Sequence, residues 1–509
     1  MTTPLATRSD TQGHATRHSP LATLLALLLF VSGTASAAEK LSIVRVNVTT
    51  QQWDFHRPWG KRQPFTRRAI GAVIPGSRVL VTAELVANCT YLELETPEGG
   101  RKVPATVEAV DYEANLAVLK TDDADFLAGA PELQIAESGI GEPLSVLQLE
   151  NNGRLLVTKG PMTTAENTAY PVDGSFLIYR MTVQLQGRES SFTLPVVNNG
   201  KLTGVLMGYE AQSNNANVIP APVIRHFLKD IAGGHYEGFP RVGYSFSPTR
   251  DPALRRFAKI PADVPGGIYI TDILKGGPAA LAGLQKGDVL FAVDDSAVDQ
   301  DGNFPDARYG QIPIGHLFTT HHFVGDKVKL HILRDGERKT LEVTLAHRPA
   351  SSYASDPYII DQRPRFAVVG GLILQELSRQ YLKDFGADWL RRAPERLVYF
   401  DRFQTELFKD GPRKLVFLSR VLPTSATVGY EDLNHLLVKK INGVELQSLD
   451  DVPKALEKPE NGFHKIEFEE DPKTIYLDAA EIQKTERAVQ MQYRLPVLKF
   501  LESLRASGE

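Results

Sequence analysis

Short runs of alternating apolar and polar residues fill the chain from residue 41 to about residue 231. Glycine, proline and asparagine interrupt these runs at close spacing, as in antiparallel barrels and sandwiches. One helical pattern, at residues 222–231, then precedes a pair of glycines. We therefore expect a mainly β domain over residues 38–232, with strands at 42–49, 79–82, 91–95, 103–110, 116–119 and 201–207.

The strand-rich pattern returns twice toward the C-terminus. Residues 233–347 predict strands, a short helix, a Gly-Asp turn and a final strand at 340–345. Residues 348–365 are rich in proline, serine and aspartate and predict a linker. Residues 366–509 repeat the pattern more loosely, and residues 479–504 have the periodicity of a helical extension. The chain therefore predicts two smaller β-rich domains with short helices.

The N-terminus carries a separate apolar segment. Residues 21–31 form an apolar run after Arg8 and Arg17, and the small residues Ala35-Ser36-Ala37 follow. A helix of this length rises only about 16 Å, roughly half of a bilayer core. Residues 1–37 therefore predict a signal peptide. We expect an exported protein, in the periplasm, without a stable membrane span.

Composition adds few constraints. The 509 residues carry a formal net charge of −4, with 42% hydrophobic and 23% charged residues, which is ordinary for globular chains. This balance does not predict a nucleic-acid partner. Cys89 is the only cysteine, so the chain has no intramolecular disulfide. We expect Cys89 to be a small buried apolar residue.

Two tandem motifs carry a family resemblance. The first repeat contains Gly277-Pro278-Ala279-Ala280 and Gly287-Asp288, and the second contains Lys440-Ile441-Asn442-Gly443. After a β-rich domain in an exported chain, these motifs resemble the PDZ domains of the HtrA/Deg serine proteases, of the plant and bacterial Deg type. The resemblance covers nearly all of residues 41–480. It implies a mainly β fold, with a trypsin-like double β-barrel before two PDZ domains, and a trimer-based homo-oligomer.

The three residues on which the family's chemistry depends differ in this chain. The resemblance places Leu85 where the family has its histidine, Asn115 where it has aspartate and Phe192 where it has the nucleophilic serine. None of these side chains can supply the base, the orienting carboxylate or the nucleophile. We therefore expect no inherited catalytic mechanism.

The loop beside the nucleophile position also differs. The family's glycines correspond to Ser190, Thr193 and Leu194. These residues have a Cβ atom, which makes a backbone conformation with positive φ unfavourable. A rewired hydrolase stays open as an alternative, because the same domain holds other polar groups, namely Ser190, Ser191, Glu84, His56 and His226.

PDZ domains bind a peptide as an added strand, and backbone N–H groups of a glycine loop receive its terminal carboxylate. In the first repeat the matching loop is Arg241, Val242, Gly243 and Tyr244. Arg241 either attracts the carboxylate or is a solvated loop cation. In the second repeat the matching loop is 369–372, and the resemblance implies a role in assembly for this repeat.

Two further segments contain residue types that are typical of interfaces or of metal sites. The aromatic stretch 53–65 fits either a trimer contact or part of the barrel core. His316, His321 and His322 lack the i, i+4 spacing of a helical metal site, so we predict no metal there. No glycine-rich phosphate loop lies between a strand and a helix, and we predict no cofactor.

The sequence favours an exported, non-catalytic HtrA/Deg-like protein that binds C-terminal peptides or unfolded exported proteins, as a chaperone, adaptor or scaffold. Two alternatives stay open. One is a serine-type endopeptidase with a rewired active site, and the other is a regulatory pseudoenzyme subunit of an active protease.

Overall fold

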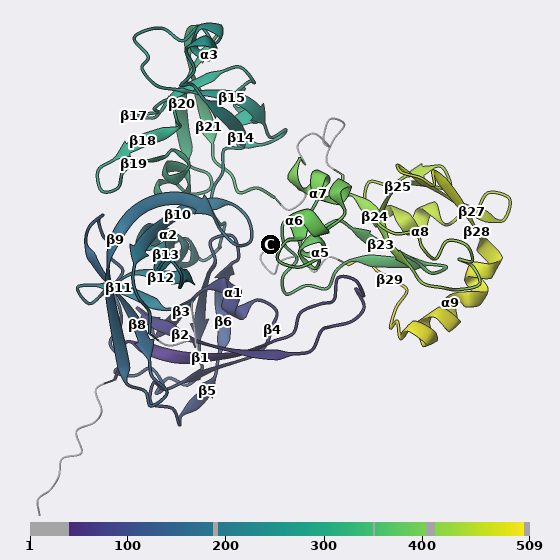
Figure 1. The fold of residues 1–509 in the computed structure, drawn as a ribbon, viewed down its shortest axis with the longest axis horizontal. Coiled ribbons are helices and arrows are strands. Elements are labelled where there is room, and N and C mark those ends of the chain that lie inside the picture. Colours follow the sequence, from purple (N-terminus) through teal and green to yellow (C-terminus); the bar gives the residue numbers. More distant parts are fainter. Residues whose placement is uncertain (1–39, 187–191, 350–351, 404–412, 503–509) are drawn as a thin grey trace, which may run out of the picture. The chain divides into compact units, whose positions relative to one another are not determined.

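The structure is a computed structural model that describes residues 40–186, 192–349, 352–403 and 413–502 (Figure 1). The predicted signal peptide, residues 1–37, lies outside the described residues. Within the described part of the chain, no helix combines the length and the apolar character needed to cross a membrane. From Leu41 onward the chain forms one unit.

The first domain begins with a seven-stranded sheet in the order β5-β4-β1-β2-β3-β7-β6. Val46 and Val48 of β1 are fully buried, because their strand lies inside this sheet with apolar neighbours on its buried face. The strand expected at 103–110 is two strands, which separate at Ala105. The elements are β1 (Ile43–Thr50), β2 (Phe65–Ile74), β3 (Arg78–Val81), α1 (Ala83–Val86), β4 (Cys89–Glu95), β5 (Lys102–Pro104), β6 (Thr106–Asp111) and β7 (Leu116–Lys120).

The domain continues as a closed barrel of six strands in the order β10-β13-β12-β11-β8-β9. These strands are β8 (Pro143–Leu149), β9 (Leu155–Ala169), β10 (Ser175–Thr182), β11 (Pro195–Asn198), β12 (Lys201–Glu210) and β13 (Asn215–Pro220). Strand β9 pairs with β8 through Pro161 and then with β10 from Met162. Gly160 lies at this change of partner, where a Cβ would stand 2.0 Å from the carbonyl oxygen of Thr182. The glycine therefore permits the close approach that closes the barrel.

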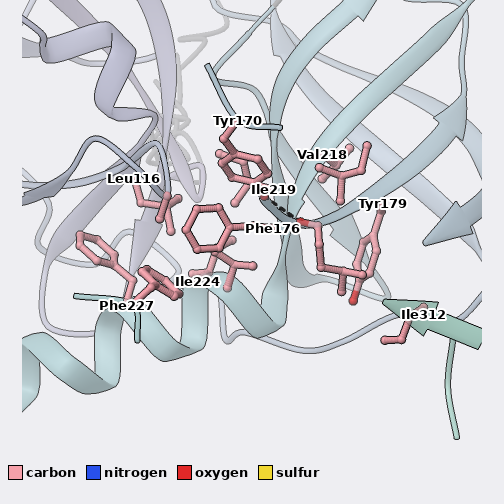
Figure 2. Close-up of a cluster of buried hydrophobic side chains, with 14 of the residues drawn as sticks. Leu116, Tyr170, Phe176, Tyr179, Val218, Ile219, Ile224, Phe227 and Ile312 are labelled. Atoms are coloured by element: carbon pink, nitrogen blue, oxygen red, sulfur yellow. Dashed lines mark hydrogen bonds between the residues drawn. The ribbon is translucent and has the colours of Figure 1, made fainter. Parts of the chain in front are cut away.

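Helix α2 (Ala221–Ala232) follows the barrel and agrees with the predicted helical pattern. Ile224 and Phe227 of α2 gather with Leu116 and Phe176 in one apolar cluster (Figure 2). Each of these four side chains is at most 1% exposed, so their burial holds the helix on the barrel.

The first repeat is a six-stranded sheet with the path β14-β15-β16-β20-β21, in which β17 pairs with β16, plus the hairpin β18-β19. Its elements are β14 (Tyr244–Pro248), α3 (Pro252–Phe257), β15 (Ile268–Ile273), α4 (Pro278–Leu281), β16 (Val289–Val293), β17 (Ser296–Ala297), β18 (Asn303–Asp306), β19 (Gly310–Pro313), the π-helical turn η1 (Leu317–His321), β20 (Lys327–Arg334) and β21 (Glu337–Thr344).

The second repeat has an eight-stranded sheet with the path β28-β27-β25-β24-β23-β22-β29, in which β26 pairs with β25. Its elements are β22 (Phe366–Val369), β23 (Leu372–Glu376), α5 (Arg379–Lys383), α6 (Trp389–Arg392), α7 (Glu395–Arg402), β24 (Val416–Val421), β25 (Leu436–Ile441), β26 (Val444–Glu445), α8 (Asp451–Ala455), β27 (Phe463–Phe468), β28 (Thr474–Asp478), α9 (Ala479–Tyr493) and β29 (Lys499–Phe500).

The helical extension predicted at 479–504 is too long. Helix α9 ends at Tyr493, because Arg494 takes a left-handed backbone conformation with φ 54° and Pro496 follows two residues later. The chain then returns as β29, which pairs with β22 through Phe366 and Ala367. The segment beyond the helix therefore completes the sheet.

Part of the aromatic stretch 53–65 packs against the second repeat rather than in the barrel core, and its role in a trimer contact stays a prediction. Phe55 is 7% exposed and packs with Tyr381 and Leu382 of the second repeat, and Trp59 packs against Phe366. The side-chain amide of Gln375 donates a hydrogen bond to the Phe55 carbonyl at 3.1 Å. The stretch therefore contributes to the core of the second repeat.

Candidate functional site

The three positions that resemble a serine-protease triad lie together in the first domain. Leu85 in α1 is fully buried in the apolar cluster under the seven-stranded sheet, and Phe192 packs against that cluster. Asn115, in the β6–β7 turn, accepts the Glu84 N–H at 2.9 Å through Oδ1. Leu85 and Phe192 therefore contribute to one apolar cluster, and Asn115 lies beside the helix that carries Leu85.

Asn115 keeps the backbone geometry of this turn. Its φ is 53°, a left-handed conformation that asparagine tolerates, and its side chain is buried. Within the described residues its Nδ2 has no hydrogen-bond partner. A buried amide nitrogen without a partner is costly, so one polar group at this site is left unsatisfied.

Arg67 and Glu84 form an ion pair beside the cluster. The Arg67 guanidinium donates to the Glu84 carboxylate at 3.1 Å and to the Glu84 carbonyl at 2.7 Å. It also lies over the Phe192 ring, 4.9 Å from the centroid. An aromatic ring capped by an arginine thus stands at the position expected for a nucleophile.

Thr193, which follows Phe192, has a strained backbone, and its polar groups are hydrogen-bonded. Thr193 has φ 51°, which is unfavourable for a β-branched residue, and its N–H donates to the Leu206 carbonyl at 2.7 Å. Its hydroxyl hydrogen-bonds to that of Thr82. Ser190 and Ser191, the alternative nucleophiles, lie outside the described residues.

The two histidines weighed for a rewired site are engaged in aromatic packing. His56 lies against Tyr381 and Phe385 of the second repeat. His226 is stacked between Phe239 and Phe323, and burial lowers its pKa to about 4. At neutral pH the His226 imidazole is therefore uncharged and held between two rings.

The glycine loop of the first repeat presents unpaired amides. Gly243 has φ 86°, and its carbonyl accepts the Leu274 N–H at 2.9 Å. The Val242 carbonyl likewise accepts the Ala279 N–H. Among the described residues, the N–H groups of Val242 and Gly243 donate no hydrogen bond. Successive unpaired amides in a turn form an anion-binding concavity.

Strand β14, which begins at Tyr244, continues from this loop along the edge of its sheet. It pairs with β15 alone, so its other edge is unpaired within the described chain. Most of its side chains are exposed or half-buried, and Phe246 is 39% exposed. An unpaired edge beside free amides is the geometry that strand addition of a peptide requires.

Arg241 is directed away from this loop. Its guanidinium donates to the Glu113 carboxylate of the first domain at 2.6 Å and lies 3.9 Å from Asp173. Burial opposes ionisation of Glu113, but His347 and Arg241 outweigh it and lower its pKa to about 2. From the sequence we expected Arg241 either to attract the peptide carboxylate or to be a solvated cation. In the structure it forms an ion pair with Glu113 that anchors the loop.

The corresponding loop of the second repeat is closed. Gly370 and Gly371 form the two-residue turn of the hairpin β22-β23, with φ 61° and 126°. A Cβ at Gly371 would stand 2.6 Å from the Leu422 carbonyl oxygen, so only glycine fits. The strand after this loop, β23, has β22 on one side and β24 on the other. No edge of β23 is left for a peptide.

Comparison with known proteins agrees with this architecture. Residues 240–345 match a PDZ domain family, and residues 356–498 match a second family of the same description, PDZ domain. The fold is mainly β, with a trypsin-like domain followed by two PDZ domains, as the sequence predicted.

The relatives share most of the chain's length. Protease Do-like 2, chloroplastic, from Arabidopsis thaliana is 27% identical over 84% of this chain and 70% of its own length. Protease Do-like 4, mitochondrial, from the same plant is 24% identical over 89% of this chain and 84% of its own length. Over most of its length the chain is similar to Do-like proteases of the HtrA/Deg family, and it carries two PDZ domains.

Solved structures give a partial match. The HtrA-type protease AlgW with tripeptide is 16% identical, with a TM-score of 0.47, over 60% of this chain and 94% of its own chain.

Proposed function

We propose that this chain is an exported, non-catalytic HtrA/Deg homologue that binds peptides through its first PDZ domain. One observation carries the proposal. Among the described residues, strand β14 has an unpaired edge, and it lies next to the Val242 and Gly243 N–H groups, which donate no hydrogen bond. Together they offer a ladder for a peptide backbone and two donors for its terminal carboxylate.

The apolar cluster at Leu85 and Phe192 supports the non-catalytic part. Hydrolysis by the family's mechanism requires a base and a nucleophile in hydrogen-bonding contact, and these two positions supply a buried aliphatic group and an aromatic ring. The ligands we propose are C-terminal peptides or unfolded segments of exported proteins. The trimer-based assembly implied by the family is part of the proposal and is tested by light scattering of the purified chain.

Peptide binding is tested with a fluorescent peptide library that has free C-terminal carboxylates. We expect selected members to bind the wild-type protein, and their amidated forms to bind at least tenfold more weakly, since the loop amides lose the anionic partner. Gly243→Trp should abolish binding.

The matched control is Gly325→Trp. Gly325 lies in the same domain, has a similar φ of 88° and has open space around it. Equal loss of binding in both variants, or equal binding of amidated and free peptides, would contradict the assignment of the loop.

The non-catalytic part is tested with casein and a serine-directed fluorophosphonate probe. We expect neither cleavage nor labelling. Cleavage that disappears in Ser190→Ala or Ser191→Ala would establish the rewired protease instead. Export is tested by cell fractionation and N-terminal sequencing, with processing after residue 37 as the expected result.

A further inference from the structure

The π-helical turn η1 brings two histidines of the first PDZ domain together. His316 stands at its N-terminal end and His321 is its last residue, and their rings meet edge to face with centroids 5.4 Å apart. In a π turn the hydrogen bonds join residues five apart, so positions i and i+5 share one side. The i, i+4 spacing expected of an α-helical metal site therefore does not apply to this turn.

Asp306 joins these two side chains from the end of β18. One ligand atom from each of Asp306, His316 and His321 lies within 4.8 Å of the other two. The backbone N–H groups of Arg308 and Tyr309 hold Asp306 Oδ1 at 2.8 and 2.9 Å. The carboxylate is therefore fixed in place by its own turn before any ligand binds.

His316 is positioned by a neighbouring hydroxyl. Its side chain is 1% exposed, and Thr320 Oγ1 lies 3.2 Å from its Nδ1 and 3.3 Å from its Nε2. The same hydroxyl donates to the His316 carbonyl at 2.8 Å, so its lone pairs can accept a ring N–H. Either ring nitrogen is within reach of this hydroxyl, so one can donate to it while the other serves as a ligand, as metal-binding histidines require.

The cluster lines a cavity of about 640 Å³ that has room for water. Three cations also line it: Arg225 and Arg308, which both form ion pairs with Glu137, and Lys229, whose ammonium lies over the Phe323 ring. The charge of the two arginines is thus directed at Glu137 rather than at the three candidate ligands. We assign no ligand role to Glu137, because its carboxylate already serves these two partners.

We propose that Asp306, His316 and His321 form a binding site for a divalent transition metal, Zn²⁺ being the ion that their chemistry fits best. Two imidazoles and one carboxylate are a known three-ligand set for this ion, with water completing a tetrahedron. Tetrahedral ligands about 2.1 Å from Zn²⁺ lie roughly 3.4 Å apart. The three ligand atoms, now within 4.8 Å of one another, would have to move closer together to reach that spacing, and His321 is the exposed member of the three.

The site would connect two elements that are not paired with each other. Asp306 belongs to the hairpin β18-β19, whereas both histidines belong to the segment around η1. A bound metal would therefore clamp the hairpin to the π turn and stabilise the first PDZ domain in proportion to its occupancy. This role is separate from peptide binding at β14.

The test uses the full chain, stripped with a chelator and titrated with Zn²⁺ by calorimetry and with Co²⁺ by visible absorption. We expect one Zn²⁺ per chain, a higher melting temperature in its presence and the absorption of four-coordinate Co²⁺. His321→Ala and Asp306→Asn should each weaken Zn²⁺ binding at least tenfold. Both side chains are accessible enough that their replacement should leave the fold intact, which circular dichroism checks.

The matched control is His331→Ala, on β20 of the same domain, where the ring hydrogen-bonds to Thr340. Its affinity for Zn²⁺ should equal that of the wild type. Absence of Zn²⁺ binding by the folded wild type overturns the proposal, as does binding that His321→Ala and Asp306→Asn leave unchanged.

Discussion

The two PDZ domains of this chain differ at the one strand that a PDZ domain offers to a peptide. In the first, β14 follows the glycine loop and has a single neighbour, β15. In the second, the corresponding strand β23 is covered by β22, which is covered in turn by β29. A similar sequence pattern therefore gives an open edge in one domain and a filled edge in the other.

The difference shows that a strand-addition site is defined by what the rest of the chain leaves unpaired. An open edge presents unsatisfied backbone groups to water and to partners, whereas a paired edge does not. Within the described residues, the first PDZ domain keeps this open edge next to amides without a partner, and the second PDZ domain uses the equivalent position for its own sheet. The proposed peptide binding therefore belongs to the first PDZ domain, whereas the corresponding strand of the second PDZ domain is part of its own sheet.

The largest effect should come from placing the same side chain in both glycine loops. Gly371→Val forces a β-branched residue to φ 126° with a Cβ 2.6 Å from a backbone oxygen, and should cost about 4 kcal/mol of stability in the second domain. At Gly243 the nearest atom to an added Cβ is the Leu274 Cβ at 3.3 Å, so Gly243→Val should lower stability by about half as much. The same variant should also lose peptide binding.

Hydrogen exchange of β22 and β23, measured beside that of β14, separates the two effects. Loss of peptide binding in Gly371→Val, with β14 still protected as in the wild type, would break the assignment of peptide binding to the first PDZ domain.

An intermediate effect on stability should come from removing the ion pair between Glu113 and Arg241, which anchors the glycine loop of the first PDZ domain. The pKa of Glu113 is about 2 in the folded protein against an ordinary value of 4.5, so its ionised form contributes stability above pH 4.5 that is lost as pH falls toward 2. Its side chain is 5% exposed, and Glu113→Gln should lower the free energy of unfolding by roughly 3 kcal/mol at pH 7.

Urea unfolding of the two proteins between pH 7 and pH 3 measures this difference, which should shrink below pH 4.5. Glu166→Gln is the control, because Glu166 forms an exposed pair with Arg180, and it should change stability by less than about 0.5 kcal/mol. A difference that stays constant with pH would show that the charge of Glu113 is not what holds the loop.

The smallest effect should come from the exposed face of β14. Phe246→Ser removes a ring that is 39% exposed, so global stability should change by less than about 1 kcal/mol. If peptides lie along β14, the dissociation constant for peptide should be about threefold higher in Phe246→Ser than in the wild type, because the apolar contact with the ring is lost. Anisotropy titration measures it, and Tyr476→Ser, an exposed aromatic residue on β28 of the second domain, should leave binding unaltered.

The sequence predicted the modules because their signals are local. Glycine turns, short apolar runs and the Gly-Asp turn at Gly287 are each determined by neighbouring residues, and the structure has strands at the predicted places. The flanking apolar residues also fixed Leu85, Asn115 and Phe192 well enough that these positions meet in space.

Features that depend on distant partners were beyond that reasoning. The Arg241–Glu113 pair joins residues far apart in the sequence, and neither residue type carries a signal of its partner. The proximity of Asp306, His316 and His321 was not foreseen for a local reason, because a π turn changes which residues share a side and no sequence signal marked it. The packing of Phe55 on the second PDZ domain likewise follows from tertiary contacts alone.

Strand β29 has a consequence for the order in which the two PDZ domains mature. A chain that emerges with its N-terminus first has every strand of the first PDZ sheet once Thr344 is out. The second PDZ sheet gains its last strand only with Phe500, long after Phe366, the residue it pairs with, has appeared. During that interval the edge of β22 that later pairs with β29 has no partner strand. A chaperone that protects nascent sheets would therefore be needed longest at β22.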